Sequence, residues 1–167
     1  MKTLKDLTQQ QIDKILTSDM KDTYMRYGYE VTRHCDTTLT LVDIFTIKGQ
    51  TELFDDVFKV EEKCKQLFIE EVENNPNRCK GSVWLIGHVD LDRTEKRSIK
   101  YTYEGGLQGI GQSMGYMACA NYKDALWFNS LDEVCEYLKH YCYNDEAVLI
   151  SLYKGWLYEQ ITGKRLL

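Results

Sequence analysis

Glycine is the residue type that first suggests chemistry in this chain, because several glycines follow one another in GLQGIG (106–111). A glycine-rich turn between a strand and a helix can bring backbone N–H groups close to a pyrophosphate. The dinucleotide spelling G-x-G-x-x-G is broken here, since Met114 follows Gly109 and Gly111 where a third glycine is needed. The preceding residues also predict a hairpin strand. We therefore expect no Rossmann site and interpret the glycines first as a close turn.

The same stretch resembles the pyrophosphate-binding turn of the GNAT acetyltransferases, a Gln/Arg-x-x-Gly-x-Gly/Ala turn that follows a hairpin strand. In this alternative the turn holds acetyl-CoA through Gly106, Gly109, Ile110 and Gly111. The segment NSLDEVCEYLKHY (129–141) is similar to that family's asparagine-to-tyrosine segment, which implies Tyr137 as a general acid, with His88 as another candidate for proton transfer. The chain departs from the family at the first position of the turn, where glycine replaces Gln or Arg.

Three side chains that suit metal binding or acid–base catalysis occur at alternate positions of GHVDLD: His88, Asp90 and Asp92. Alternate residues of a strand point to the same face of a sheet. An imidazole and two carboxylates on one face could bind a divalent cation or transfer protons. Trp84 and Ile86 share this face, which favours an ordinary sheet surface over a metal site.

Cysteine chemistry has weaker support in this chain. The six cysteines, at positions 35, 64, 79, 119, 135 and 142, include no C-x-x-C pair and lie in segments that predict helices and strands. We interpret them as reduced core side chains. A Cys/His nucleophile stays open, because such residues meet in space and not in sequence.

Carboxylates dominate the segment from Thr51 to Asn74, whose apolar spacing predicts an amphipathic helix. Together with a tryptophan near the C-terminus, these acids form the predicted interaction surface: Glu52, Asp55, Asp56, Glu61, Glu62, Glu70, Glu71, Glu73 and Trp156. Such carboxylates could occupy a basic groove of a partner built for nucleic acid. The alternative is a solvated helix face with i,i+4 pairs such as Glu61 with Lys65.

The C-terminal segment AVLISLYKGWLYEQI (147–161) predicts a last helix, capped by Asn144 and ended by Gly163. This helix would be apolar around most of its circumference. It must then be buried on more than one side, either in the core or against a second copy of the chain. The chain has twelve tyrosines, and tyrosine suits surfaces that are partly apolar and partly solvated, as binding interfaces are.

Further elements position these residues. A capping box of Thr8 and Gln11 predicts a short helix in LTQQQIDKILTSD, and a second box at Ser130 and Glu133 predicts another. A helix of about ten residues is also expected from about Gln112.

Two hairpins are predicted from β-branched and aromatic runs. The first joins strands 24–34 and 37–48 at Cys35 and Asp36, and the second joins strands 80–92 and 96–104. The sequence therefore predicts an α+β protein, with a mainly antiparallel sheet of about four to five strands packed against several helices, in a single compact domain spanning 1–167.

Charge and hydropathy limit the function. The 26 acidic and 21 basic residues give a net charge of −5, which argues against direct binding to nucleic acid. No apolar run suits a membrane span or a secretion signal, so we expect a cytoplasmic protein. The sequence predicts a protein that binds and modulates another protein, such as a phage or mobile-element accessory protein that inhibits a host nuclease or defence system. The alternative is a small GNAT-like acyltransferase that uses acetyl-CoA.

Overall fold

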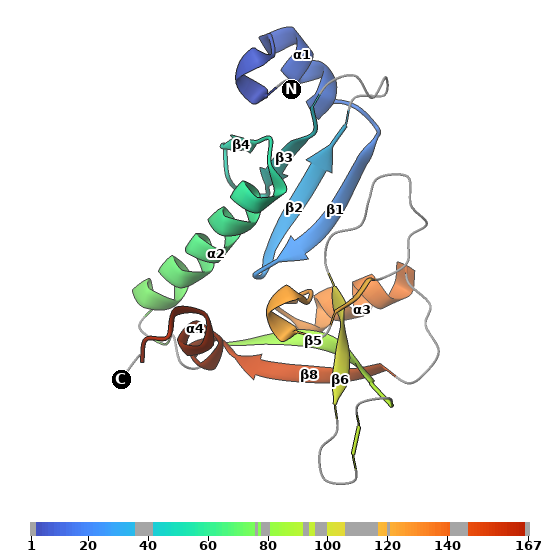
Figure 1. The fold of residues 1–167 in the computed structure, drawn as a ribbon, viewed down its shortest axis with the longest axis vertical. Coiled ribbons are helices and arrows are strands. Elements are labelled where there is room, and N and C mark those ends of the chain that lie inside the picture. Colours follow the sequence, from blue (N-terminus) through green and yellow to red (C-terminus); the bar gives the residue numbers. More distant parts are fainter. Residues whose placement is uncertain are drawn as a thin grey trace.

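The structure is a computed structural model that describes residues 3–35, 42–75, 77, 81–91, 94–95, 100–105, 117–119, 121–140 and 147–165. Its elements in chain order (Figure 1) are η1 (Leu4–Asp6), α1 (Gln9–Leu16), β1 (Lys21–Arg26), β2 (Tyr29–His34), β3 (Ile44–Ile47), β4 (Leu53–Phe54), α2 (Val57–Asn74), β5 (Ser82–Val89), β6 (Tyr101–Gly105), β7 (Met117–Cys119), η2 (Tyr122–Asp124), α3 (Leu131–His140), β8 (Ala147–Tyr153) and α4 (Lys154–Thr162).

The strands form antiparallel sheets, which confirms the predicted α+β class. Within the described residues, β1-β2-β3-β4 make one four-stranded sheet and β7-β6-β5-β8 make another. The expected strands are thus divided between two sheets, one in the upper and one in the lower part of Figure 1. None of the helices in the described part of the chain has the length and apolarity that crossing a bilayer requires.

The first sheet corrects the position of the first hairpin. Residues 24–34 were expected to be one strand, but they contain the end of β1, a two-residue turn and β2. The turn residues Tyr27 and Gly28 have φ angles of 52° and 85°. Positive φ at both central residues suits the right-handed twist of a tight hairpin. β2 then pairs with β3, so Ile44–Ile47, within the predicted second strand, is the third strand of a meander.

The amphipathic helix is α2, and it begins at Val57 instead of Thr51. The residues before it pair with β3 as β4, and the Asp56 side chain accepts a hydrogen bond from the Phe58 amide at 2.7 Å as the N-cap. The predicted stripe is correct, since the buried side chains of this helix include Val60 and Phe68.

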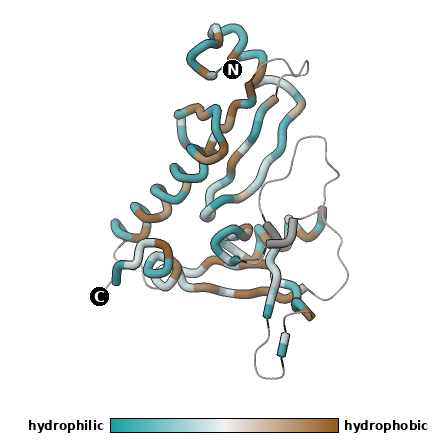
Figure 2. Tube along the Cα trace, viewed as in Figure 1, coloured by the Kyte–Doolittle hydropathy of each residue, from teal (hydrophilic) through white to brown (hydrophobic). Residues whose placement is uncertain are grey.

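Helix α2 packs against both sheets. Val60 and Cys64, in its first half, contact a cluster with Val31 of the first sheet. Phe68, in its second half, belongs to a cluster with Trp127 and the β5 residues that face it. Figure 2 shows hydrophobic positions recurring along the helix, as this double contact requires.

Two expected helices are partly strands. The last one was expected to begin near Asn144, but Ala147–Tyr153 is β8 and pairs along its length with β5, while only Lys154–Thr162 is helical. A run rich in Val, Leu and Ile suits either structure, and the ladder to β5 decides for the strand. Likewise Met117–Cys119, inside the helix expected after Gln112, pairs with β6 as β7.

The sequence signals for other helix ends are found in the structure. Thr8 and Gln11 form the predicted capping box of α1. At α3 the Glu133 amide donates to the Ser130 hydroxyl at 3.2 Å, which is one half of the predicted box, while the Glu133 carboxylate accepts from the Asn129 amide at 2.8 Å. Gly163 ends α4 with a φ of 72°.

Candidate functional site

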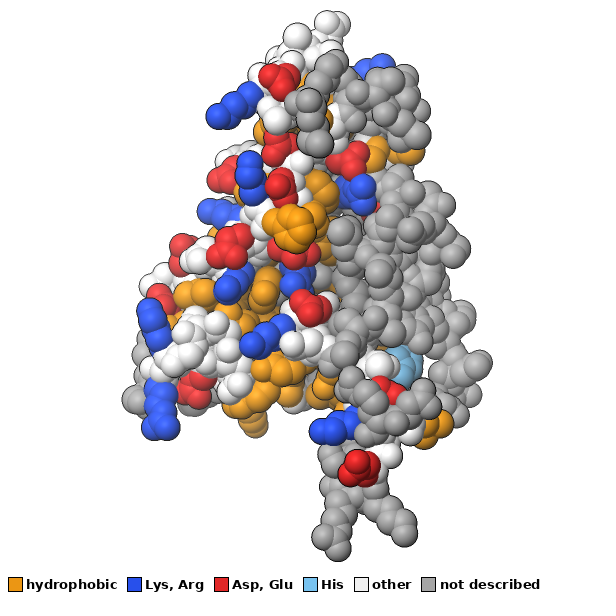
Figure 3. All heavy atoms as spheres, in the orientation of Figure 1, with side chains coloured by type: hydrophobic (Ala, Val, Ile, Leu, Met, Phe, Trp, Pro, Cys, Tyr) orange, Lys and Arg blue, Asp and Glu red, His pale blue; other side chains and the backbone are white. Residues whose placement is uncertain are grey.

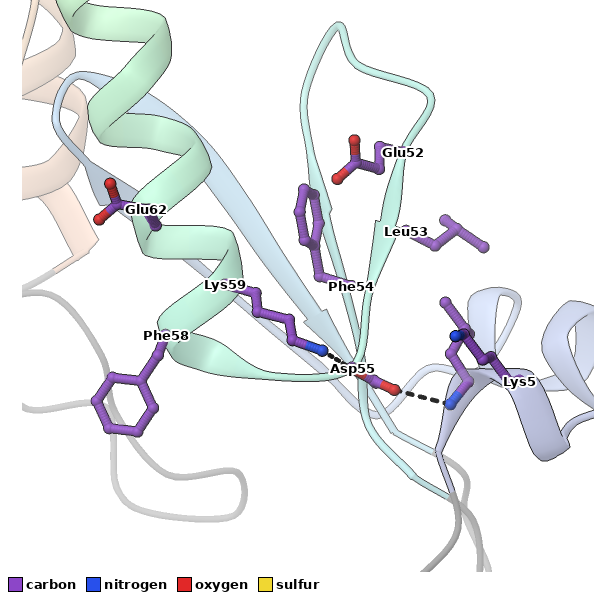
Figure 4. A pocket seen from close by; sticks show the side chains of 9 residues that line it. Lys5, Glu52, Leu53, Phe54, Asp55, Phe58, Lys59 and Glu62 are labelled. Atoms are coloured by element: carbon purple, nitrogen blue, oxygen red, sulfur yellow. Dashed lines mark hydrogen bonds and ion pairs between the residues drawn. The ribbon is translucent and has the colours of Figure 1, made fainter.

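An open pocket lies where the N-terminal segment, β4 and the start of α2 meet (Figure 4). We call it the α2 pocket. Its volume is about 560 Å³. The residues that line it are Leu4, Lys5, Glu52, Leu53, Phe54, Asp55, Phe58, Lys59 and Glu62. Three of the carboxylates predicted to form an interaction surface are therefore gathered here, together with apolar and basic side chains.

Asp55 holds the walls of the α2 pocket together. Its carboxylate accepts a hydrogen bond from the amide of Leu4 at 2.8 Å, which ties η1 to the start of α2. The same carboxylate lies 3.8 Å from the Lys59 amine one helical turn later. The next residue, Asp56, caps the helix. These two acids therefore build the pocket and the helix end, which leaves Glu52 and Glu62 as the exposed carboxylates of the pocket.

Phe58 is the feature of the pocket that the sequence reasoning missed. Its side chain is 77% exposed, whereas nearby Phe54 is 7% exposed. The sequence does contain a signal for this exposure, because Phe58 lies outside the buried stripe of Val60, Cys64 and Phe68 and so points away from the core. Figure 4 shows the Phe58 ring projecting from the helix on the side that carries Glu62.

The other predicted carboxylates of α2 mostly bind groups of their own chain. Glu71 accepts from the Lys154 amine at 2.8 Å and from the Tyr29 hydroxyl at 3.2 Å. Glu73 accepts from the Tyr158 hydroxyl at 2.8 Å. These contacts join α2 to β2 and α4, while Glu70 is exposed like Glu62. Figure 3 shows acidic and basic side chains intermixed over this face of the molecule.

Glu61 belongs to an ion-pair network with Arg26, which is only 7% exposed. The Arg26 Nε lies 3.4 Å from the Glu61 carboxylate, and its Nη1 donates to the Lys123 carbonyl at 2.6 Å. Its Nη2 also donates to the carboxylate of Asp124 at 3.3 Å. The pairing expected for Glu61 was with Lys65, so the structure gives this acid a different and more buried partner.

Two of the three candidate metal residues, His88 and Asp90, are described, at the end of β5 and just after it. His88 is half-buried on β5 opposite Thr102, and the Asp90 amide donates to the Lys100 carbonyl at 2.8 Å. Asp92 lies outside the described residues. Among the residues that are described, no three His, Cys, Asp or Glu side chains gather as a cation site.

The residues of the acyltransferase alternative are only partly described. The turn of Gly106, Gly109, Ile110 and Gly111 lies outside the described residues, so its role stays a prediction. The Tyr137 ring lies 5.3 Å from the Phe128 ring and packs on the cluster around Val134.

Trp156 lies on α4 and is 42% exposed, with its ring 5.2 Å from that of Tyr122. It therefore belongs to a different part of the predicted interaction surface than the α2 pocket does.

The described cysteines differ in environment. Cys35 and Cys64 are buried, as predicted, and burial is the main cause that raises the pKa of each thiol to about 12. Such thiols are not nucleophilic at neutral pH. The expectation that Cys135 is a core residue is wrong, because its side chain is exposed on α3 beside buried Val134.

Comparison of the chain with protein-family models, with curated proteins and with solved structures gives no match in any of the three.

Proposed function

We propose that this chain acts by binding another protein at the α2 pocket and so modulates that protein. The observation that carries the proposal is the exposed Phe58 ring beside a pocket with an apolar floor. Burying a phenylalanine side chain contributes about 1.5–3 kcal/mol, so an aromatic ring on the rim can anchor a complex. A binding partner could insert an apolar side chain and cover the ring in the same step.

The charges around the α2 pocket suggest which partner would fit. Asp55 and Lys59 already pair with each other, so Glu52 and Glu62 provide the negative charge available to a partner, opposed by Lys5. Glu70 adds a further exposed carboxylate on the same helix. We infer a partner segment that presents an apolar side chain flanked by lysine or arginine. The narrower prediction, inhibition of a nuclease with a basic groove, requires the same charge pattern.

The experiment compares proteins retained from a lysate of the native host by immobilised wild-type chain and by variants. Phe58→Glu places a charge at the proposed anchor, and Leu131→Glu makes the same change at a leucine of α3 that is 45% exposed. We expect a stoichiometric partner that is lost with Phe58→Glu and retained with Leu131→Glu. Equal retention by both variants, or no stoichiometric partner with wild-type protein, contradicts the proposal.

Charge complementarity has its own test with the retained partner. Combined Glu52→Lys and Glu62→Lys changes should weaken binding at low salt more than at high salt, because salt screens exposed charges. An unchanged affinity would show that the partner does not use these carboxylates.

A further inference from the structure

The outer edge of β8 is a second exposed feature of the structure, far along the chain from the α2 pocket. β8 ends the order of the second sheet, and its strand neighbour among the described residues is β5 (Figure 1). The Lys154 amide donates to the Gly81 carbonyl of the β5 side at 2.7 Å. Backbone groups alternate in direction along an antiparallel strand, so those of Leu149 and Ser151 point away from β5.

This edge lacks the devices that usually prevent strands from pairing. The seven residues of β8, AVLISLY, contain no charged residue and no proline. Proteins commonly protect an exposed edge with lysine, proline or a bulge. Instead, Leu149 and Tyr153 are 46% and 64% exposed on one face of this strand. An uncharged edge of this length is a template for another uncharged strand.

We propose that β8 pairs antiparallel with β8 of a second copy, about a two-fold axis at Ile150, and so joins two second sheets into one. In this register Leu149 of one copy lies opposite Ser151 of the other, and the outward N–H and C=O groups of both residues meet in hydrogen bonds.

The side chains of β8 fit the same register. Leu149 of one copy meets the small Ser151 of the other, and Tyr153 meets Ala147. Each large exposed side chain on this face is therefore matched with a small one, and no like charges are brought together. Because β8 paired antiparallel with itself places each large side chain opposite a small one, we assign this edge to a second copy of the chain and not to an unrelated protein.

The test is sedimentation equilibrium of the full chain from micromolar to millimolar concentration. The wild-type chain should dimerise. Ser151→Pro removes an N–H group that points outward and does not bond to β5. An edge strand tolerates proline at such a position. Losing one hydrogen bond from each copy should weaken association about thirtyfold. Ser151→Ala keeps both the N–H and a small side chain opposite Leu149, so it should dimerise like wild type.

A second pair of variants avoids the backbone change. Leu149→Lys puts a charge on the proposed interface, and Leu131→Lys makes the same substitution at the similarly exposed leucine of α3. We expect loss of the dimer with Leu149→Lys alone. A wild-type chain that stays monomeric throughout, or equal association of the two lysine variants, overturns the proposal. Partner binding at the α2 pocket is scored separately with Phe58→Glu, so either proposal can fail without the other.

Discussion

The Arg26 network gives the sharpest prediction for stability. Replacing Arg26 with methionine removes the guanidinium and keeps most of the side-chain volume. The bond to the Lys123 carbonyl, from a charged donor on a residue that is 7% exposed, contributes about 1.5–3 kcal/mol. The pairs with Glu61 and Asp124 contribute less, about 0.5–1 kcal/mol each, because those carboxylate side chains are 27% and 63% exposed. We expect Arg26→Met to lower the free energy of unfolding by about 3 kcal/mol.

Arg33 on the neighbouring strand is a matched control. It pairs with Asp43 at 2.7 Å, and the two side chains are 24% and 30% exposed. Each arginine also lies over a ring: the Arg26 guanidinium is 4.6 Å from the Tyr27 centroid, and that of Arg33 is 5.8 Å from the Phe45 centroid. Since the Arg33 pair stays accessible to water, Arg33→Met should cost only about 1 kcal/mol.

Urea denaturation followed by tryptophan fluorescence measures both losses, because Trp127 is fully buried and reports the core. The two variants should unfold with wild-type m-values, so that differences in midpoint report stability. A loss for Arg26→Met no larger than that for Arg33→Met would refute the argument that burial makes the Arg26 network strong.

Three further predictions concern other buried groups. Burial, and next a neighbouring lysine, lower the pKa of His34 below 6.5, so the unfolded chain binds more protons. The free energy of unfolding should therefore fall as pH drops through about 6.5, and His34→Gln should flatten this slope in urea titrations at several pH values. Iodoacetamide at neutral pH should label exposed Cys135 well before buried Cys64, as peptide mass spectrometry would show, and equal rates would contradict the burial. A Cβ on Gly87 would lie 2.7 Å from Cδ1 of Ile150, so Gly87→Ala should cost about 1 kcal/mol. In thermal melts, the double variant Gly87→Ala with Ile150→Val should lose less stability than the two single variants lose together. Additive losses would mean that the Ile150 side chain moves away from the new Cβ without cost.

The candidate site could be predicted in part from the sequence. The sequence shows that the α2 region is acidic, and Glu52, Asp55 and Glu62 do line the pocket. The full set of lining residues could not be predicted, because Leu4 comes from the N-terminal segment and is joined to Asp55 by a tertiary hydrogen bond. Sequence spacing likewise could not show that Glu71 binds the amine of Lys154 from a distant helix.

Signals that act within a few residues determined the local structure from the sequence alone. The capping box at Thr8 and Gln11, the apolar stripe of α2 and the stop at Gly163 each depend on neighbours along the chain, and each is found in the structure. Hydrogen bonds of caps and the period of a helix are complete within one or two turns, so no distant contact is needed to specify them.

Only the tertiary structure decided where apolar segments without such signals belong. Ala147–Tyr153 can bury its side chains as a helix or as a strand, and pairing with β5 selects the strand. Leu53–Phe54 is similarly drawn out of the expected helix by β3. A strand's backbone hydrogen bonds are made with residues far away in the sequence, so its existence depends on a partner that local patterns do not reveal.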